Sequence, residues 1–261
     1  MLDPLVREEA SVEATSEQDL EQGAEALTAV QIHSRRGDLT IEPGQPGETK
    51  VRIRATRIAG GDDETEARKN AQSIQVVGQV REGVLQVDWR LPSARSMRGE
   101  PQVHLRVIVP RGLAVRGATS AGDVVARGFD TDLKLSTGKG SIRIEQCAGA
   151  WDATANQGDV VASGRPSRVA LRSAGGRVRA SLDTQGPLQG RIETRSGSVE
   201  LALGPEASVR VVGETDGGEV RVDTVLEALT FRADRRGFEG VRGQGAGRLE
   251  VRAEAGSITV R

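Results

Sequence analysis

The clearest pattern of apolar and polar positions lies between residues 133 and 144, LKLSTGKGSIRI. Leu133 and Leu135 share one side of an alternating segment, and Ile142 and Ile144 share one side of the next. A period of two is typical of β-strands with one buried and one solvated side. The small, polar run between the segments ends in a glycine, which suits a sharp corner. The pattern therefore predicts a unit of strand, corner and strand.

This unit recurs through the second half of the chain. The corner glycines are spaced first by 18 residues, then by 21, and finally by 38: Gly122, Gly140, Gly158, Gly176, Gly197, Gly218 and Gly256. The last interval leaves room for one degenerate copy around Gly237. A fixed period of this size is typical of stacked units that bury their apolar side against their neighbours.

We therefore predict an all-β fold, a parallel, β-helix-like β-solenoid of right-handed coils with repeats of about 18–21 residues. At about 3.3 Å per residue, one repeat supplies two strands of about five or six residues and two corners. A meander of hairpins would also give strand, glycine turn and strand. It is the second choice, because most corners lack the Asn-Gly or Asp-Gly turn typical of hairpins.

The first half of the chain predicts further strands and one helix. A short helix is expected near residues 62–72, where an acidic first turn precedes Ala67 and Ala71 and favours the helix dipole. A loop is expected at 92–101. The remaining segments alternate as strands do: 29–41, 50–58, 74–91 with Leu85, Val87, Trp89 and Leu91 on one side, and 103–112, which ends at Pro110.

These elements divide the chain into two parts. Residues 1–28 are polar and acidic and are expected to be a loose, disordered lead-in. Residues 29–261 are expected to be a single elongated strand-repeat domain, most regular over 115–261. The sequence contains neither the apolar core of a signal peptide nor an apolar run of transmembrane length.

Composition narrows the choice of partners. The 36 basic and 37 acidic residues leave a net charge of −1, so we expect no nucleic-acid partner. Aromatic residues are 2% of the chain, as narrow coils with little space for rings would require. The single cysteine, Cys147, excludes an internal disulfide and is expected to fill the core or a corner rather than act as a nucleophile.

The order of segments carries a resemblance. A SRRGDLTI strand pair, a short acidic helix, a strand ending in VIVPRG and STGKGSIRI-like units follow one another over residues 29–261. This order resembles the bacterial putative-adhesin family of β-strand-repeat proteins, a domain of unknown function. The resemblance implies a β-solenoid in the cell envelope or outside the cell, with no catalytic residues to carry over.

Several carboxylates invite a chemical interpretation. Asp38, Asp123 and Asp159 each follow a corner glycine, and aspartates on neighbouring coils can form a calcium ladder. Ser141 and Arg177 interrupt that series, so solvated corner carboxylates are expected instead. Cleavage of a polysaccharide would need two or three carboxylates on one sheet face, and no sequence pattern brings the candidates together: Asp130, Asp132, Asp152 and Asp159.

The basic residues allow similar alternatives. His33 and His104 alternate with apolar neighbours and are expected at the surface. Stacked coils could align the dense arginines into a stripe that meets acidic polysaccharide, lipid headgroups or nucleic acid, although arginine also keeps an exposed sheet soluble. These arginines are Arg165, Arg168, Arg172, Arg177, Arg179, Arg191 and Arg195.

The sequence thus assigns no catalytic, cofactor-binding or metal-ligating residue. We expect a non-catalytic scaffold or adhesin-like module of the bacterial cell envelope that contacts an unknown protein or glycan at the cell surface. The final strand, SITVR, has no evident cap, so open strand edges are expected to allow a homo-oligomer. The alternatives are a self-assembling, cytoskeleton-like solenoid and a polysaccharide-active β-helix enzyme.

Overall fold

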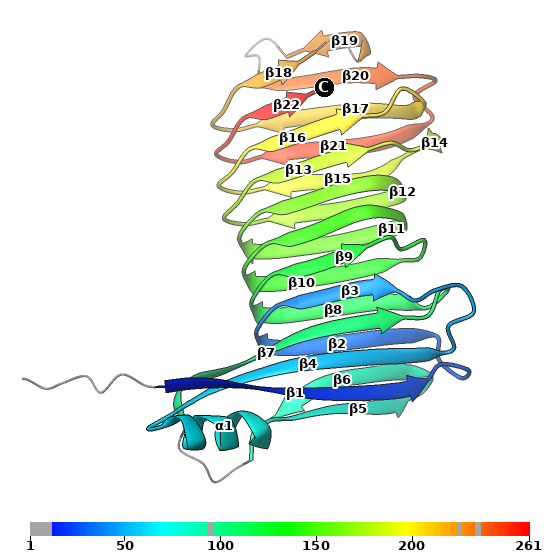
Figure 1. Cartoon of the computed structure of the whole chain (residues 1–261). Helices are drawn as coiled ribbons and strands as arrows, with labels where there is room; N and C mark the ends of the chain where they lie inside the picture. The colour runs from blue at the N-terminus through cyan, green and yellow to red at the C-terminus, as the bar shows by residue number, and fades with distance from the viewer. Residues whose placement is uncertain (1–11, 93–96, 224–225, 233–235) are drawn as a thin grey trace, which may run out of the picture.

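The computed structural model describes residues 12–92, 97–223, 226–232 and 236–261. Strands lie across a single stack, with one helix at the N-terminal end (Figure 1). The prediction of an all-β protein with a short helix is confirmed, since the described residues form a 22-stranded, mostly parallel sheet and the helix α1 (Glu64–Ser73). Asp63 caps α1 by accepting a hydrogen bond from the Glu66 backbone, and Ala67 and Ala71 face the core, as the pattern predicts.

Most strands pair side by side in one of two rows along the stack. Row A runs β5 (Gln75–Arg81), β6 (Val84–Arg90), β2 (Ala29–Arg36), β8 (Ala114–Ala121), β10 (Leu133–Lys139), β11 (Ile142–Gln157), β12 (Val160–Ser173), β15 (Gln189–Thr194), β21 (Gly247–Ala253), β17 (Ala207–Thr215), β20 (Gly237–Arg242) and β19 (Glu227–Phe231). Row B runs β1 (Val12–Gly23), β4 (Lys50–Gly61), β7 (Arg98–Val109), β3 (Leu39–Pro43), β9 (Val124–Arg127), β11, β12, β13 (Val178–Leu182), β16 (Val199–Leu203), β22 (Ile258–Val260) and β18 (Val220–Val222). The long strands β11 and β12 bend and contribute to both rows, and β14 (Gly186–Pro187) pairs with β17.

The register of the parallel pairs reproduces the repeat that the sequence predicts. Leu133 lies between Val115 and Trp151, each 18 residues away. In row B, Val178 lies between Val160 and Val199, at intervals of 18 and 21 residues. Equivalent positions of successive units are therefore nearest neighbours in the sheet.

The core lies between the two rows. Leu133, Leu135, Ile142 and Ile144 are at most 2% exposed, as the alternation predicts. A Cβ atom at Gly117 of row A would meet side chains of both rows, which places the inner faces of the rows in contact. Each fully buried aliphatic side chain contributes about 2 kcal/mol through removal of apolar surface from water.

Most corners combine a close backbone approach with a buried hydroxyl group, whereas Ala155 and Ala253 stand at the equivalent positions before Gly158 and Gly256. Gly140 has a φ of +135°, and a Cβ atom there would lie 2.2 Å from the Gly122 carbonyl oxygen. Thr137 lies three residues before this glycine and donates a 2.8 Å hydrogen bond to the same oxygen. The same bond to a neighbouring corner recurs along the stack: Thr119 to Gly37, Ser173 to Gly158, Thr194 to Gly176 and Thr215 to Gly256.

At the N-terminal end, residues 12–23 form the strand β1, although the sequence predicted a loose lead-in over 1–28. β1 pairs antiparallel with β4 from Val12–Gly61 to Gly23–Lys50. Its polar side chains alternate without an apolar face, so periodicity gave no strand signal. Backbone pairing and hydrogen bonds from the buried Arg57 stabilise it instead.

At the opposite end, two expectations were wrong. Gly237 does not mark a degenerate coil but begins β20, which pairs antiparallel with β17. The final strand β22 does not end the stack, because it lies between β16 and β18. Two smaller differences lie between these ends. Residues 93–96 of the predicted loop at 92–101 lie outside the described residues, and Arg98 already begins β7. Leu91, expected on the apolar side of its strand, is 37% exposed.

Candidate functional site

The corner aspartates lie on one line along row B, and their carboxylates bond to the backbone. The Oδ1 atom of Asp38 accepts a 2.9 Å hydrogen bond from the Asp123 backbone. Asp123 accepts in the same way from Ser141, and Asp159 from Arg177, each at 2.8 Å. These carboxylates therefore connect successive repeats. Among the described residues, no group of three or more His, Cys, Asp or Glu side chains is placed to hold a metal ion.

His104 extends the same line by one strand, on β7. Its Nδ1 atom accepts a 3.1 Å hydrogen bond from the backbone of Asp38, which lies beside it across the β3–β7 pair. His33 lies elsewhere, exposed on β2, with its Nδ1 atom 3.8 Å from Asp88. The two histidines thus do not form a common site.

The remaining candidate carboxylates have separate partners. Asp132 accepts a 3.0 Å hydrogen bond from the Ala150 backbone, 18 residues away in the next repeat. Asp152 lies 3.4 Å from Lys134, and Asp130 lies 3.9 Å from Arg111. Each carboxylate is thus satisfied locally, and nothing in these contacts pairs two of them for acid–base chemistry.

Six of the seven dense arginines form ion pairs, and they do not share one face. Arg172, Arg191 and Arg195 lie on row A, whereas Arg177 and Arg179 lie on the corner and outer face of row B. The pairs are Arg165–Asp183, Arg172–Glu193, Arg177–Asp159, Arg179–Glu200, Arg191–Glu193 and Arg195–Glu254. The described residues provide no ion-pair partner for Arg168.

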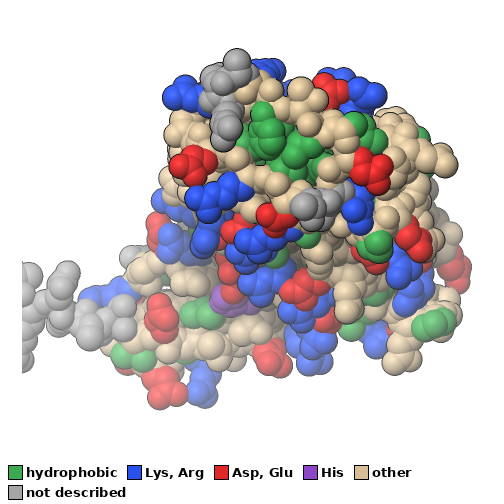
Figure 2. Space-filling model, turned by 90° about the horizontal axis from the view of Figure 1, so that it is seen from above, with side chains coloured by type: hydrophobic (Ala, Val, Ile, Leu, Met, Phe, Trp, Pro, Cys, Tyr) green, Lys and Arg blue, Asp and Glu red, His purple; other side chains and the backbone are tan. Residues whose placement is uncertain are grey.

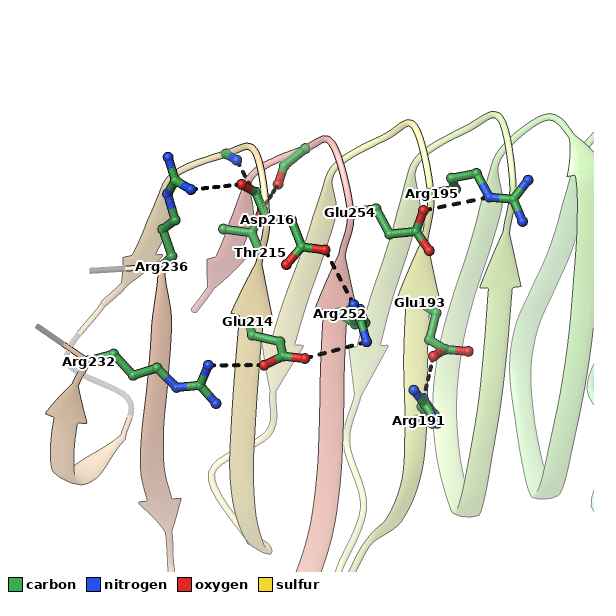
Figure 3. Close-up of polar contacts among 12 residues, drawn as sticks. Arg191, Glu193, Arg195, Glu214, Thr215, Asp216, Arg232, Arg236, Arg252 and Glu254 are labelled. Atoms are coloured by element: carbon green, nitrogen blue, oxygen red, sulfur yellow. Dashed lines mark hydrogen bonds and ion pairs between the residues drawn. The ribbon is translucent and has the colours of Figure 1, made fainter. Parts of the chain in front are cut away.

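On row A, charged side chains of both signs lie on successive strands, and we call this series the charge line (Figure 3). Arg172 contacts Glu193 at 3.2 Å, Arg252 contacts Glu214 at 3.6 Å, and Glu214 contacts Arg232 at 3.1 Å. Glu193 and Arg252 are direct neighbours in the β15–β21 register. Beside this line lies a depression of about 250 Å³.

The pairs of this surface stabilise the charged forms of their members. A hydrogen bond to Asp216 raises the pKa of Arg252, with the charge of Asp216 adding to it. On row B, the hydrogen bond from Arg179 lowers the pKa of Glu200. Because the arginines of these pairs are exposed, water screens each pair, and its net contribution to stability is small. The charge line therefore keeps the face polar with little net field.

A second depression on row A differs in its charges. It lies over β2, β8 and β10, measures about 430 Å³, and is lined in part by Gln31, His33, Arg116, Lys134 and Ser136. The exposed Arg116 has no hydrogen-bond or ion-pair partner among the residues that the structure describes. This depression therefore offers an uncompensated guanidinium group beside further hydrogen-bonding side chains.

A comparison with solved structures gives matches that cover nearly the whole chain. The chain is similar to a putative cell adhesion protein from Clostridium sporogenes, with 10% identity, a TM-score of 0.43, and coverage of 95% of this chain and 99% of that one. It is also similar to a putative adhesin from Bacteroides fragilis, with 14% identity, a TM-score of 0.45, and coverage of 94% and 97%. No protein-family model and no curated protein matches the chain.

Cys147 is 2% exposed, and burial raises the pKa of its thiol, so the expected core position is confirmed. Its Sγ atom donates to the backbone oxygen of Glu145 at 3.3 Å. A protonated, buried thiol is a poor nucleophile. Within the described residues, no helix combines the length and the apolar character needed to cross a bilayer.

Two features were missed from the sequence: the inward hydroxyl groups at the corners, and Arg116, which has no partner among the described residues. The inward hydroxyl groups could have been found, because Ser or Thr stands three residues before five of the corner glycines, as at Thr194 and Gly197. The unpaired state of Arg116 could not, because it depends on which residues of the neighbouring coils lie beside it.

Proposed function

We propose that this chain is a non-catalytic, right-handed β-solenoid that serves as a scaffold or adhesin-like module of the bacterial cell envelope. Parallel neighbours offset by one 18-residue repeat support the solenoid coil. Right-handed connections are the rule between parallel strands. The sequence resemblance to the putative-adhesin family supports the role and the location.

The contact surface that we propose is the 430 Å³ depression over β2, β8 and β10. Arg116 is the observation that carries this proposal. Its guanidinium group is exposed and has no partner among the described residues, so a carboxylate-bearing glycan or an acidic protein surface can bind it without displacing an internal ion pair. Lys134, His33 and Gln31 add hydrogen-bonding groups around it.

The test is binding of acidic oligosaccharides and acidic peptides to the whole chain, measured by calorimetry. We expect Arg116→Ala to weaken binding about tenfold or more, as loss of a charge-assisted hydrogen bond does. Arg179→Ala is the matched control, because Arg179 is also exposed but pairs with Glu200 on row B. Equal binding by the wild-type chain and Arg116→Ala would reject this surface.

The other parts of the proposal have their own tests. Incubation with acidic polysaccharides should release no new reducing ends, and their release would establish an enzyme. Fractionation of cells that express the native gene with an epitope tag should place the protein in the envelope. Recovery in the cytosolic fraction alone would contradict that location.

A further inference from the structure

The two rows end at different levels at the C-terminal end of the stack. β17 and β18 flank the same turn of the chain, but row A continues beyond β17 with β20 and β19, whereas row B ends at β18. Figure 1 shows the resulting step, with β19 beyond the level of β18. Among the described residues, the outer edge of β18 has no strand partner.

Apolar side chains are exposed at this step. Val220 and Val222 are only partly buried, although Ile258 and Val260, which occupy the same positions one strand earlier, are fully buried. Phe231 on β19 is 43% exposed. Figure 2 shows apolar side chains gathered at this end within a rim of both charges. An apolar patch with a polar rim is typical of a protein interface.

The N-terminal end is protected in a way that the C-terminal end is not. The side-chain amide of Gln18 on β1 bonds to both backbone groups of Val76 on β5, at 2.9 and 3.0 Å, and so occupies part of that strand edge. β1 itself presents Glu17, Asp19 and Glu21 along the other edge. Charged and occupied edges resist strand addition.

We propose that two copies of this chain associate through their C-terminal ends about a two-fold axis. β19 of each copy lies against the free edge of β18 in the other, which places Phe231 and Leu229 over Val220 and Val222. The step makes the end self-complementary, because each copy supplies one projecting and one recessed row. This is the arrangement that an isologous interface requires.

The charges at the rim fit a second copy as the occupant. On the recessed row, Glu219 and Arg221 are 74% and 75% exposed and form an ion pair with each other at 3.0 Å, so this part of the rim has no net charge. A two-fold axis brings groups of both signs opposite each other without a net repulsion. The association stops at two copies, because the N-terminal end offers no matching step for a third. It does not involve the depression over β2, β8 and β10.

The first test is the mass of the whole chain in solution by sedimentation. We expect a dimer at micromolar concentration and at least a tenfold weaker dimer for Phe231→Glu, as for other central apolar contacts. Val80→Glu is the matched control, because Val80 is 44% exposed on β5 at the opposite end. A chain that is still monomeric at about 100 μM would overturn the proposal, because its dissociation constant would then exceed that of the weakest specific interfaces. A polymer, or a dimer abolished by Val80→Glu, would also overturn it.

A second test reports orientation. Cys147 is buried and therefore does not react with a thiol-specific fluorophore, so a single engineered surface cysteine can be labelled selectively. Arg221→Cys should give strong energy transfer between copies, and Glu64→Cys, at a side chain 72% exposed on α1, should give weak transfer. Strong transfer from Glu64→Cys alone would place the contact at the wrong end. Circular dichroism and the Tm of each variant confirm that it is folded.

Discussion

The corner glycines are required for two different reasons. At Gly140, a positive φ and a close approach to the Gly122 oxygen coincide. Gly176 does not have a positive φ, yet a Cβ atom there would lie 2.2 Å from the oxygen of Gly158. Conformational freedom, the reason available from the sequence, therefore explains only part of the series, and the spacing of the coils explains the rest.

Three glycine variants separate these reasons. Gly176→Ala should lower the free energy of unfolding by about 3 kcal/mol or more, because backbone must move to admit the methyl group. Gly47→Ala should cost about 1–2 kcal/mol, since Gly47 has a φ of +86° but open space around it. Gly23→Ala should change little, because Gly23 has neither constraint. Urea unfolding measures all three, and equal losses at Gly176 and Gly47 would contradict the role of spacing.

Cys147 predicts a pH dependence of stability. Because burial raises the pKa of the folded thiol above its ordinary value of 9.0, the folded state keeps its proton where the unfolded state loses it. The contribution of Cys147 is therefore fully present below pH 9.0 and is lost as the pH rises above it. The free energy of unfolding of the wild-type chain should fall more steeply above this pH than that of Cys147→Ala. Parallel curves would show that the thiol has the same pKa in both states.

At the scale of elements, the sequence predicts those that have an apolar face or a cap. The helix at 62–72 and the strand at 50–58 correspond to α1 and β4. β1 was missed because polar contacts position it. Arg57 on β4 is 8% exposed and donates to the backbone oxygens of Glu17 and Ile74, both at 2.8 Å. One side chain thereby connects β1 to the segment that follows α1.

This arrangement predicts that the stable pairing of β1 with β4 depends on Arg57. Arg57→Leu removes hydrogen bonds to Ser16, Glu17, Gln18 and Ile74, and should lower stability by about 2 kcal/mol or more. Hydrogen exchange should accelerate in residues 12–23 before it does in the core strands. Arg54→Ala is the control, because Arg54 makes an exposed pair with Asp19 and should leave exchange unchanged. Uniform acceleration throughout the chain would instead show a general loss of stability.

At the scale of the whole molecule, the period was predictable from the sequence and the order of the layers was not. The segment 247–260 pairs with β15 and β16 on one side and with β17 and β18 on the other. It therefore lies between two layers that both precede it in the sequence. β2 and β3 likewise lie inside β6 and β7. Repeats with the same inner face can stack in any order, so only the packing of the end strands decides which layer is outermost.

Interchangeable layers predict that the stack tolerates loss of one repeat, provided that the alternation is kept. Deletion of 135–152 joins Lys134 to Ala153, and Ala153 occupies the inward position of Leu135 in the next coil. Deletion of 135–151 differs by one residue and turns Asp152 inward, which places an unpaired carboxylate in the core. We expect the first variant to unfold cooperatively at a modestly lower Tm, and the second to be expressed as aggregate. If circular dichroism and thermal unfolding showed both to be folded alike, the inner faces of the layers would not be what specifies the stack.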